Sequence, residues 1–116
     1  MKQLLVLLAL SASTALAQGD RATITGTVTD QAGAAIPAVM VTATHLDTMS
    51  LSKVSTNQSG EYSLPSLPTG KYKVLFELPG FKSSVHNNVD LEAGATDRVD
   101  AKLEIGNVQQ SVEVIS

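Results

Sequence analysis

Apolar and polar residues alternate with a period of two from residue 22 onward, and no other feature of the chain constrains its fold as strongly. In the first such run, Ile24, Gly26 and Val28 alternate with threonines. Successive side chains of a β-strand point to opposite faces, so this pattern is typical of a strand buried on one face. Apolar positions with the spacing of a helix occur only in the first residues of the chain. The sequence therefore predicts an all-β protein.

Turns rich in Gly, Pro, Asn and Asp separate the alternating runs at short intervals. These turns lie at residues 30–33, 57–60, 65–70, 79–80 and 93–95. Glycine adopts the positive φ that such turns need, and proline cannot donate a hydrogen bond to a neighbouring strand. The segments between the turns predict a seven-stranded, Greek-key-like β-sandwich over residues 22–105.

The parity of each run predicts which side chains face the core. In the clearest strand, residues 71–78, the inward positions are Tyr72, Val74, Phe76 and Leu78. In the second run Val39, Val41 and Ala43 are expected to face inward, opposite Met40, Thr42 and Thr44. The final strand is expected to run without interruption and to share one face among Val99, Ala101, Leu103 and Ile105.

The first 17 residues have the composition of a secretory signal peptide. A short basic start precedes an unbroken apolar run over residues 4–10, and Ala15-Leu16-Ala17 is a small-x-small cleavage site. Cleavage is expected between Ala17 and Gln18, which leaves a short lead over residues 18–21. The apolar run is too short to span a bilayer, and no second apolar span occurs after it. We therefore expect an exported chain that does not itself insert into a membrane.

Charge and cysteine content narrow the classes of partner and chemistry. Removal of Lys2 with the signal peptide leaves seven basic against eleven acidic residues, a net charge of −4. A chain this acidic is a poor partner for nucleic acids or anionic membrane surfaces. With no cysteine, it has no disulfide, thiolate metal site or cysteine nucleophile. These properties favour a bacterial periplasm or cell surface.

Spaced motifs through residues 22–105 resemble the carboxypeptidase regulatory-like domains, which are transthyretin-like (prealbumin-like) β-sandwiches. The resemblance begins at Ile24-Thr25-Gly26-Thr27-Val28-Thr29-Asp30 and continues through later turn and strand residues. The positions that match the family pattern are Gly26, Val28, Asp30, Gly33, Pro37, Gly60, Tyr62, Leu64, Leu67, Pro68, Gly70, Tyr72, Pro79, Gly80 and Phe81. In this family such residues build the fold and do not catalyse a reaction. The resemblance therefore implies a scaffold.

The last segment, residues 106–116, differs in character from the sandwich. Val112 and Val114 alternate as in a strand, but no turn or polar tail occurs before Ser116. Similar domains stand behind signal peptides at the N-terminus of TonB-dependent outer-membrane receptors, where a similar segment precedes a plug and a barrel. The resemblance implies that residues 106–116 lead to a further segment of the same polypeptide or to a partner.

No set of residues in the chain points clearly to catalysis or to a metal. His45 and His86, with Asp47 or Asp90, lack the short spacing typical of zinc ligands, so we interpret them as a solvated strand-end histidine and a strand-face histidine. No serine lies in a Gly-x-Ser-x-Gly elbow. The hydroxyisourate hydrolases share the fold, but this chain lacks their Tyr-Arg-Gly-Ser ending. We predict no enzyme activity, no metal and no cofactor.

Carbohydrate binding is the alternative, because related sandwiches are grouped with carbohydrate-binding folds. Sugar recognition commonly uses exposed aromatic rings, and this chain has no tryptophan. The parity of their strands assigns Tyr62, Tyr72 and Phe76 to the core. Phe81, on the Pro79-Gly80 loop, is the one ring expected to be exposed and the one candidate ligand contact.

The sequence as a whole predicts a non-enzymatic, exported accessory or interaction module. Its expected context is the N-terminal periplasmic region of a TonB-dependent outer-membrane receptor, with a membrane β-barrel in the same polypeptide or a partner protein. The alternative is a free-standing periplasmic or secreted module that binds glycans. A bacterium with an outer membrane is the expected source.

Overall fold

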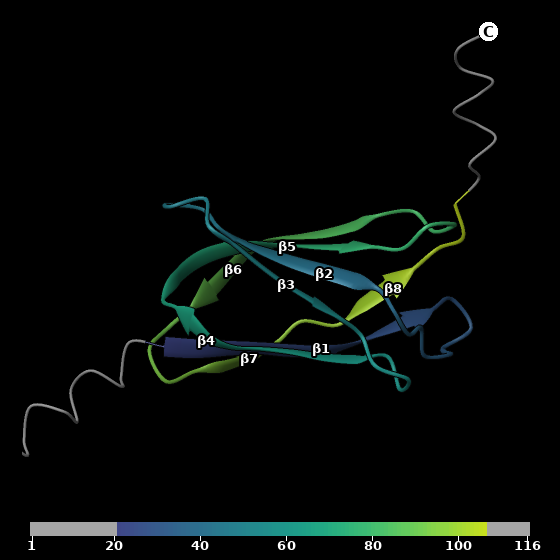
Figure 1. Ribbon diagram of the computed structural model, residues 1–116, viewed down its shortest axis with the longest axis horizontal. Coiled ribbons are helices and arrows are strands. Elements are labelled where there is room, and N and C mark those ends of the chain that lie inside the picture. Colours follow the sequence, from purple (N-terminus) through teal and green to yellow (C-terminus); the bar gives the residue numbers. More distant parts are fainter. Residues whose placement is uncertain (1–20, 107–116) are drawn as a thin grey trace, which may run out of the picture.

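In the computed structural model, residues 21–106 form two facing β-sheets, and the structure describes this part of the chain only (Figure 1). The strands are β1 (Arg21–Asp30), β2 (Met40–His45), β3 (Leu51–Ser55), β4 (Glu61–Pro68), β5 (Gly70–Glu77), β6 (Ser84–Leu91), β7 (Thr96–Arg98) and β8 (Ala101–Leu103). One sheet has the order β4-β1-β7, with β8 also paired to β1, and the other has the order β3-β2-β5-β6. Over the same residues there is no helix that could cross a membrane.

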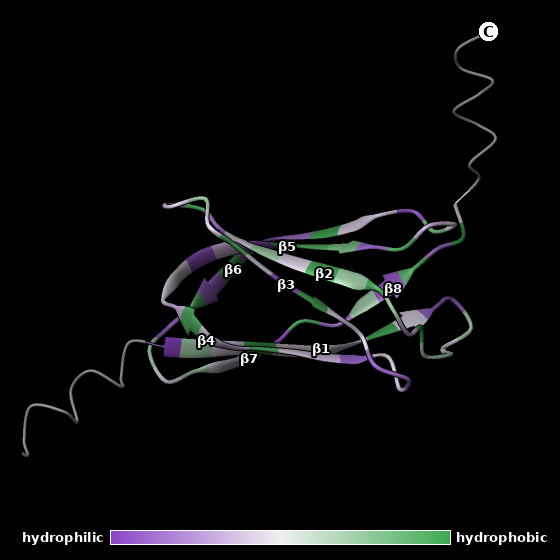
Figure 2. Cartoon of the chain, viewed as in Figure 1, coloured by the Kyte–Doolittle hydropathy of each residue, from purple (hydrophilic) through white to green (hydrophobic). Residues whose placement is uncertain are grey.

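The all-β sandwich is confirmed, and the period-two pattern gives its core. Hydrophobic and hydrophilic residues are interspersed along the strands (Figure 2). Ile24 and Val28 of β1 face Val41 of β2 and Val74 and Phe76 of β5 across the sandwich, and all five side chains are fully buried. Burial of aliphatic and aromatic side chains of this size contributes roughly 1.5–3 kcal/mol each to folding. The predicted inward faces of these strands are therefore correct.

The last predicted strand is divided into two. Both β7 and β8 run parallel to β1, but residues 99 and 100 between them leave the regular ladder. There the Val99 N–H donates to the Thr25 carbonyl, and the Thr27 N–H donates to the Asp100 carboxylate at 2.8 Å. The carboxylate takes the place of a strand carbonyl, so pairing continues across the break. Ile105, expected on the core face, lies beyond β8 and is 76% exposed.

The division of the strand occurs where β1 carries a glycine. A Cβ atom on Gly26 would overlap the Val99 carbonyl oxygen, so only glycine leaves room for this peptide. The Tyr62 hydroxyl donates a hydrogen bond to the same oxygen. The Tyr62 ring in turn packs edge-on against Phe76 of the other sheet, with ring centroids 5.7 Å apart. We call this set of contacts, between Gly26, Tyr62 and Val99, the Gly26 notch.

Two threonines expected on the polar face of β2 are buried. Thr42 and Thr44 are 8% and 7% exposed, although they point away from the core. The reason is that β2 is an interior strand. Its outward side chains lie between longer ones on β3 and β5, such as Lys53 and Leu75 beside Thr42. Parity alone therefore gives the direction of a side chain but not its burial.

The Gly26 notch predicts an unusual sensitivity of this position to a single methyl group. Gly26→Ala should lower the free energy of unfolding by about 3 kcal/mol, because the new Cβ must displace a backbone carbonyl. Gly33→Ala is the matched control, since its Cβ meets nothing within 4 Å and the positive φ costs about 1 kcal/mol. Urea-induced unfolding measured by circular dichroism compares both. Equal losses of unfolding free energy in the two variants would contradict the role of the Gly26 notch.

Candidate functional site

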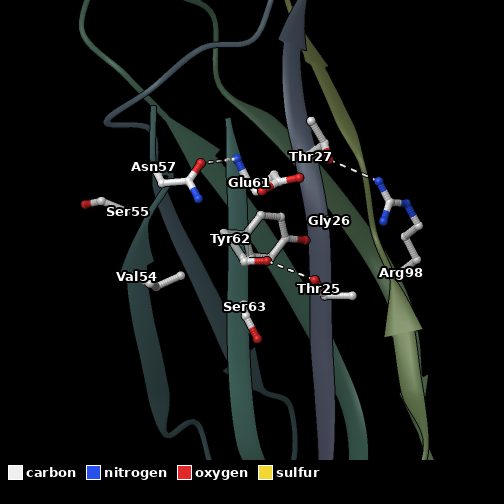
Figure 3. A pocket seen from close by; sticks show the side chains of 10 residues that line it. All are labelled: Thr25, Gly26, Thr27, Val54, Ser55, Asn57, Glu61, Tyr62, Ser63 and Arg98. Atoms are coloured by element: carbon white, nitrogen blue, oxygen red, sulfur yellow. Dashed lines mark hydrogen bonds between the residues drawn. The ribbon is translucent and has the colours of Figure 1, made fainter. Parts of the chain in front are cut away.

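A groove of about 470 Å³ lies beside β4 and extends over the neighbouring strands (Figure 3). It is lined by Thr25, Gly26, Thr27, Val54, Ser55, Asn57, Glu61, Tyr62, Ser63 and Arg98. The hydroxyl, amide, carboxylate and guanidinium groups in this set come from the outer side of β1, β4 and β7 and from the edge near β3. We call it the polar groove.

Hydrogen bonds within the protein hold most of these polar side chains in place. The Arg98 guanidinium donates to the Thr27 hydroxyl at 3.0 Å and to the Asp100 carboxylate at 3.1 Å. The Thr25 hydroxyl donates to the Tyr62 carbonyl at 3.0 Å. The Arg98 and Asp100 side chains are more than half exposed, so their ion pair contributes at most about 1 kcal/mol. Its main effect is to orient the guanidinium at the margin of the groove.

The Asn57 turn forms one end of the polar groove. The Asn57 side-chain oxygen accepts hydrogen bonds from the backbone N–H groups of Ser59 and Glu61, both at 2.9 Å. This is the way asparagine stabilises a tight turn, and Gly60 supplies the positive φ that the turn requires. The groove thus has a rigid frame with polar groups directed into it.

The chemistry of the polar groove suits binding. A nucleophilic site needs a hydroxyl beside a base that a third group orients, and the groove residues include no histidine. The hydroxyls of Thr25 and Tyr62 donate to carbonyls, and the Thr27 hydroxyl accepts from Arg98. Among residues 21–106 no three His, Asp or Glu side chains gather closely enough to hold a metal ion. The groove offers hydrogen-bond donors and acceptors, one cation and one anion.

The interpretation of His45 as a solvated strand-end residue is wrong. Its side chain is buried, and its Nε2 lies 2.9 Å from the Thr69 carbonyl oxygen. Its Nδ1 accepts hydrogen bonds from the N–H groups of Asp47 and Thr48, so Nε2 is the nitrogen that donates. The Nδ1 atom thus fixes the β2–β3 turn, and the Nε2 atom ties it to the connection between β4 and β5 at Thr69. Sequence parity could not reveal this, because the partners are backbone groups of two turns.

His86 and Phe81 also pack against the core, so neither side chain is freely exposed as a binding site would require. His86 packs edge-on against Phe76, with ring centroids 5.5 Å apart. Phe81, expected to be exposed, is half-buried and packs against the core. Pairing of residues 80–82 with residues 104–106 holds it there. The ring is therefore not a free platform on which a sugar could stack.

Several of the residues that match the family motif make contacts that stabilise turns of the fold. Asp30 accepts hydrogen bonds from the N–H groups of Ala32 and Ala34 and so closes the first turn. A Cβ on Gly70 would lie 2.5 Å from the His45 ring, and the Tyr72 hydroxyl donates to the Pro68 carbonyl at 2.6 Å. The predicted cleavage positions, Ala17 and Gln18, lie outside the residues that the structure describes.

Sequence reasoning did not identify Arg98 and Asp100 as surface residues of note. Arg98 is the last residue of β7, and Asp100 lies two positions later, within the break before β8. Two opposite charges two residues apart share one face of a strand, and this spacing is the sequence pattern that could have identified them. Their link to Thr27 depends on the parallel pairing of β7 with β1, which parity does not predict.

Comparison with known proteins gives a family match over most of the chain. The sequence profile of the carboxypeptidase regulatory-like domain matches residues 23–104. The TonB-dependent transporter Oar of Myxococcus xanthus is 35% identical over 104 residues, which are 89% of this chain and 10% of the transporter. The chain thus spans about a tenth of the length of this curated relative.

Two solved structures with similar folds come from proteins that differ from each other in function. A candidate carbohydrate-binding protein of Bacteroides uniformis has a TM-score of 0.60 at 20% identity, covering 73% of this chain and 42% of that one. The 3-chlorocatechol 1,2-dioxygenase of Rhodococcus opacus has a TM-score of 0.58 at 11% identity, covering 76% of this chain and 61% of that one. At these identities the likeness shows a shared fold alone.

Burial raises the pKa of Tyr62, and the nearby Asp100 carboxylate raises it further, while Arg98 lowers it. Burial also raises the pKa of Tyr72, with Arg21 acting in the opposite direction. In the unfolded chain the tyrosine pKa is 10.0. Because folding raises this pKa, the un-ionised phenol contributes its full stabilisation at pH values below 10.0. That contribution is lost as the pH rises above 10.0.

The raised pKa of Tyr62 predicts a loss of stability in alkali. Between about pH 8 and about pH 11 the buried Tyr62 should account for a loss of about 1 kcal/mol in the free energy of unfolding. Tyr62→Phe should remove that part of the pH dependence, because phenylalanine does not ionise. Urea unfolding at both pH values measures it. The same pH dependence in the variant and the parent chain would refute the assignment to Tyr62.

Proposed function

The chain belongs to the carboxypeptidase regulatory-like domain family, and on that premise we propose that it is a non-enzymatic accessory domain of a TonB-dependent outer-membrane receptor. The observation that carries the proposal is the 35% identity to the transporter Oar over 89% of this chain. Because the match covers 10% of Oar, it concerns one domain of such a receptor. Transport itself would belong to the rest of the polypeptide.

The arrangement of the strands supports a position in line with other domains. β1 begins at one end of the sandwich, and the described chain leaves after β8 at the opposite end (Figure 1). A domain entered at one end and left at the other keeps its two flanking segments apart. In the proposed receptor, residues 1–17 direct export, the sandwich lies in the periplasm, and a membrane β-barrel comes later in the same polypeptide.

The polar groove supports a binding role for this domain. Its side chains are held by bonds to one another and to the backbone, so they are pre-organised to exchange hydrogen bonds with a ligand. Catalysis would need a base beside a nucleophile, and the hydroxyls of Thr25 and Thr27 have a carbonyl and a guanidinium as partners instead. Recognition of a partner or ligand is the simpler use of these groups.

A free-standing periplasmic or secreted carbohydrate-binding module is the second candidate function. The polar groove favours it, because hydroxyl, amide, carboxylate and guanidinium groups are the usual partners of sugar hydroxyls. The groove replaces Phe81 as the expected contact surface, since the Phe81 ring is half-buried. The Tyr62 ring beneath the groove is buried as well, so a sugar would be bound by hydrogen bonds without stacking.

Fractionation of the native cells tests the receptor proposal. An antibody against residues 22–105 should detect a band many times larger than the 12.1 kDa of this chain in the outer-membrane fraction. A small band in the periplasm or the medium would contradict the receptor and favour the free-standing module. A cytoplasmic band would contradict export in either form.

Titration of the isolated chain against a panel of polysaccharides separates the two candidates further. A glycan-binding module should bind one of them, and Arg98→Ala should weaken that binding because the guanidinium borders the groove. Lys102→Ala, an exposed change on β8, is the matched control. Absence of binding to the whole panel would remove the second candidate.

A further inference from the structure

The two outer faces of the sandwich differ in chemistry. The outward positions of β1, β4 and β7 are polar, as the lining of the polar groove shows. The outward face of the β3-β2-β5-β6 sheet instead carries four aliphatic side chains, Met40, Leu51, Leu75 and Val85. We call these four the aliphatic face. Met40, Leu51 and Val85 are 40%, 58% and 47% exposed, and Leu75 is half-buried.

Register places Leu75 directly beside Val85 and diagonally across from Met40, whereas Leu51 lies apart, paired with Thr44. Thr42 on β2 pairs with Leu75 on β5, and Leu75 pairs with Val85 on β6. Directly paired residues share a face of the sheet, so the row from β3 to β6 reads Lys53, Thr42, Leu75, Val85. Within residues 21–106 no further layer covers this row. Exposed aliphatic groups that adjoin one another mark an interaction surface more often than scattered ones do.

Lysines border the aliphatic face. Lys53, Lys71 and Lys73 are exposed on the same side of the sheet, against two carboxylates there, Glu77 and Asp90. The face therefore has an excess of one positive charge, with Lys71 directly opposite Asp90, whereas the whole chain has a net charge of −3. A second copy of the chain would bring the same positive face to the contact, which is a poor electrostatic match. An acidic partner matches it well.

The turn that adjoins this face contains a strained, exposed aliphatic residue. Met49, two residues before Leu51, has a φ of 62° and is 65% exposed. Positive φ is costly for a side chain such as methionine, and Asn or Gly would suit the position better. Hydrogen bonds to the buried His45 ring hold the turn. The Met49 N–H also donates a hydrogen bond to the His45 carbonyl at 2.7 Å. The fold thus presents Met49 rigidly to solvent.

From these observations we propose that the aliphatic face is a docking surface for a separate protein whose contact region is aliphatic at its centre and acidic at its margin. The aliphatic groups supply the buried area of the contact, and the lysines select a partner of opposite charge. This docking surface lies on the β3-β2-β5-β6 sheet, and it adjoins the polar groove at β3, where Ser55 of the groove pairs with Met40. The proposal does not depend on whether the domain belongs to a receptor.

Photo-cross-linking in the native cells, with the full chain, tests the proposal. A photoreactive phenylalanine analogue replaces Val85 in one variant and Thr96, an exposed position of β7 on the other sheet and outside the polar groove, in the matched control. The variant at position 85 should give an adduct with a different protein, identified by mass spectrometry, and the variant at position 96 should not give that adduct.

Charge reversal then tests the role of the lysines. Lys53→Glu with Lys73→Glu should lower the yield of the adduct by about tenfold, because attraction at two sites becomes repulsion. Lys102→Glu on β8 changes the net charge in the same direction and should leave the yield unchanged. An unchanged melting temperature shows that each variant is folded.

Several results would overturn the proposal. They are no adduct from position 85, the same adduct from position 96, an adduct with a second copy, with lipid or within the same chain, and a yield insensitive to the lysine reversal. An adduct with a second copy would indicate a homodimer, and an adduct with lipid would indicate a membrane contact. An adduct within the chain would show that another segment covers the aliphatic face.

Discussion

The close approach of the Val99 peptide to Gly26 determines how the rest of the sandwich is assembled. β1 must pair with β4 on one edge and with both β7 and β8 on the other, although β7 and β8 do not form one continuous strand. The missing Cβ of Gly26 lets the Val99 carbonyl enter the sheet, and the Tyr62 hydroxyl satisfies that carbonyl. Because the Tyr62 ring also packs against Phe76, the same contact joins the two sheets. Without it, the Val99 carbonyl would lose both its space in the sheet and its bond from the Tyr62 hydroxyl.

This arrangement separates stability from function. The core and the turns use the residues that match the family motif, such as Tyr72 with its hydrogen bond to Pro68 and Asp30 with its turn. The outer surface carries other residues, and its two faces are unlike. One carries the polar groove beside Arg98, and the other carries the aliphatic face with its lysines. A fold shared with a dioxygenase and with a candidate carbohydrate-binding protein is compatible with a third use, because a shared fold does not by itself determine activity.

The sequence predicts the strands and their core faces well, because alternation and glycine turns are local signals. Ile24, Val74 and Phe76 could be assigned to the core without knowledge of the topology. Features that depend on neighbours distant in the sequence could not be predicted. The burial of Thr42 depends on side chains of two other strands, and the buried role of His45 depends on two turns. The polar groove and the aliphatic face likewise combine residues that only the pairing of strands brings together.

Hydrogen exchange at the Val99 amide tests most directly whether the Gly26 notch determines the assembly of the fold. This amide donates to the Thr25 carbonyl at 2.8 Å, beside the break between β7 and β8. If the notch is essential, the amide should exchange only when the whole domain unfolds, so its opening free energy should equal that of global unfolding by urea. An opening free energy several kcal/mol lower, with the Ile24 amide still protected, would show that β7 and β8 detach without unfolding the sandwich and would contradict the account.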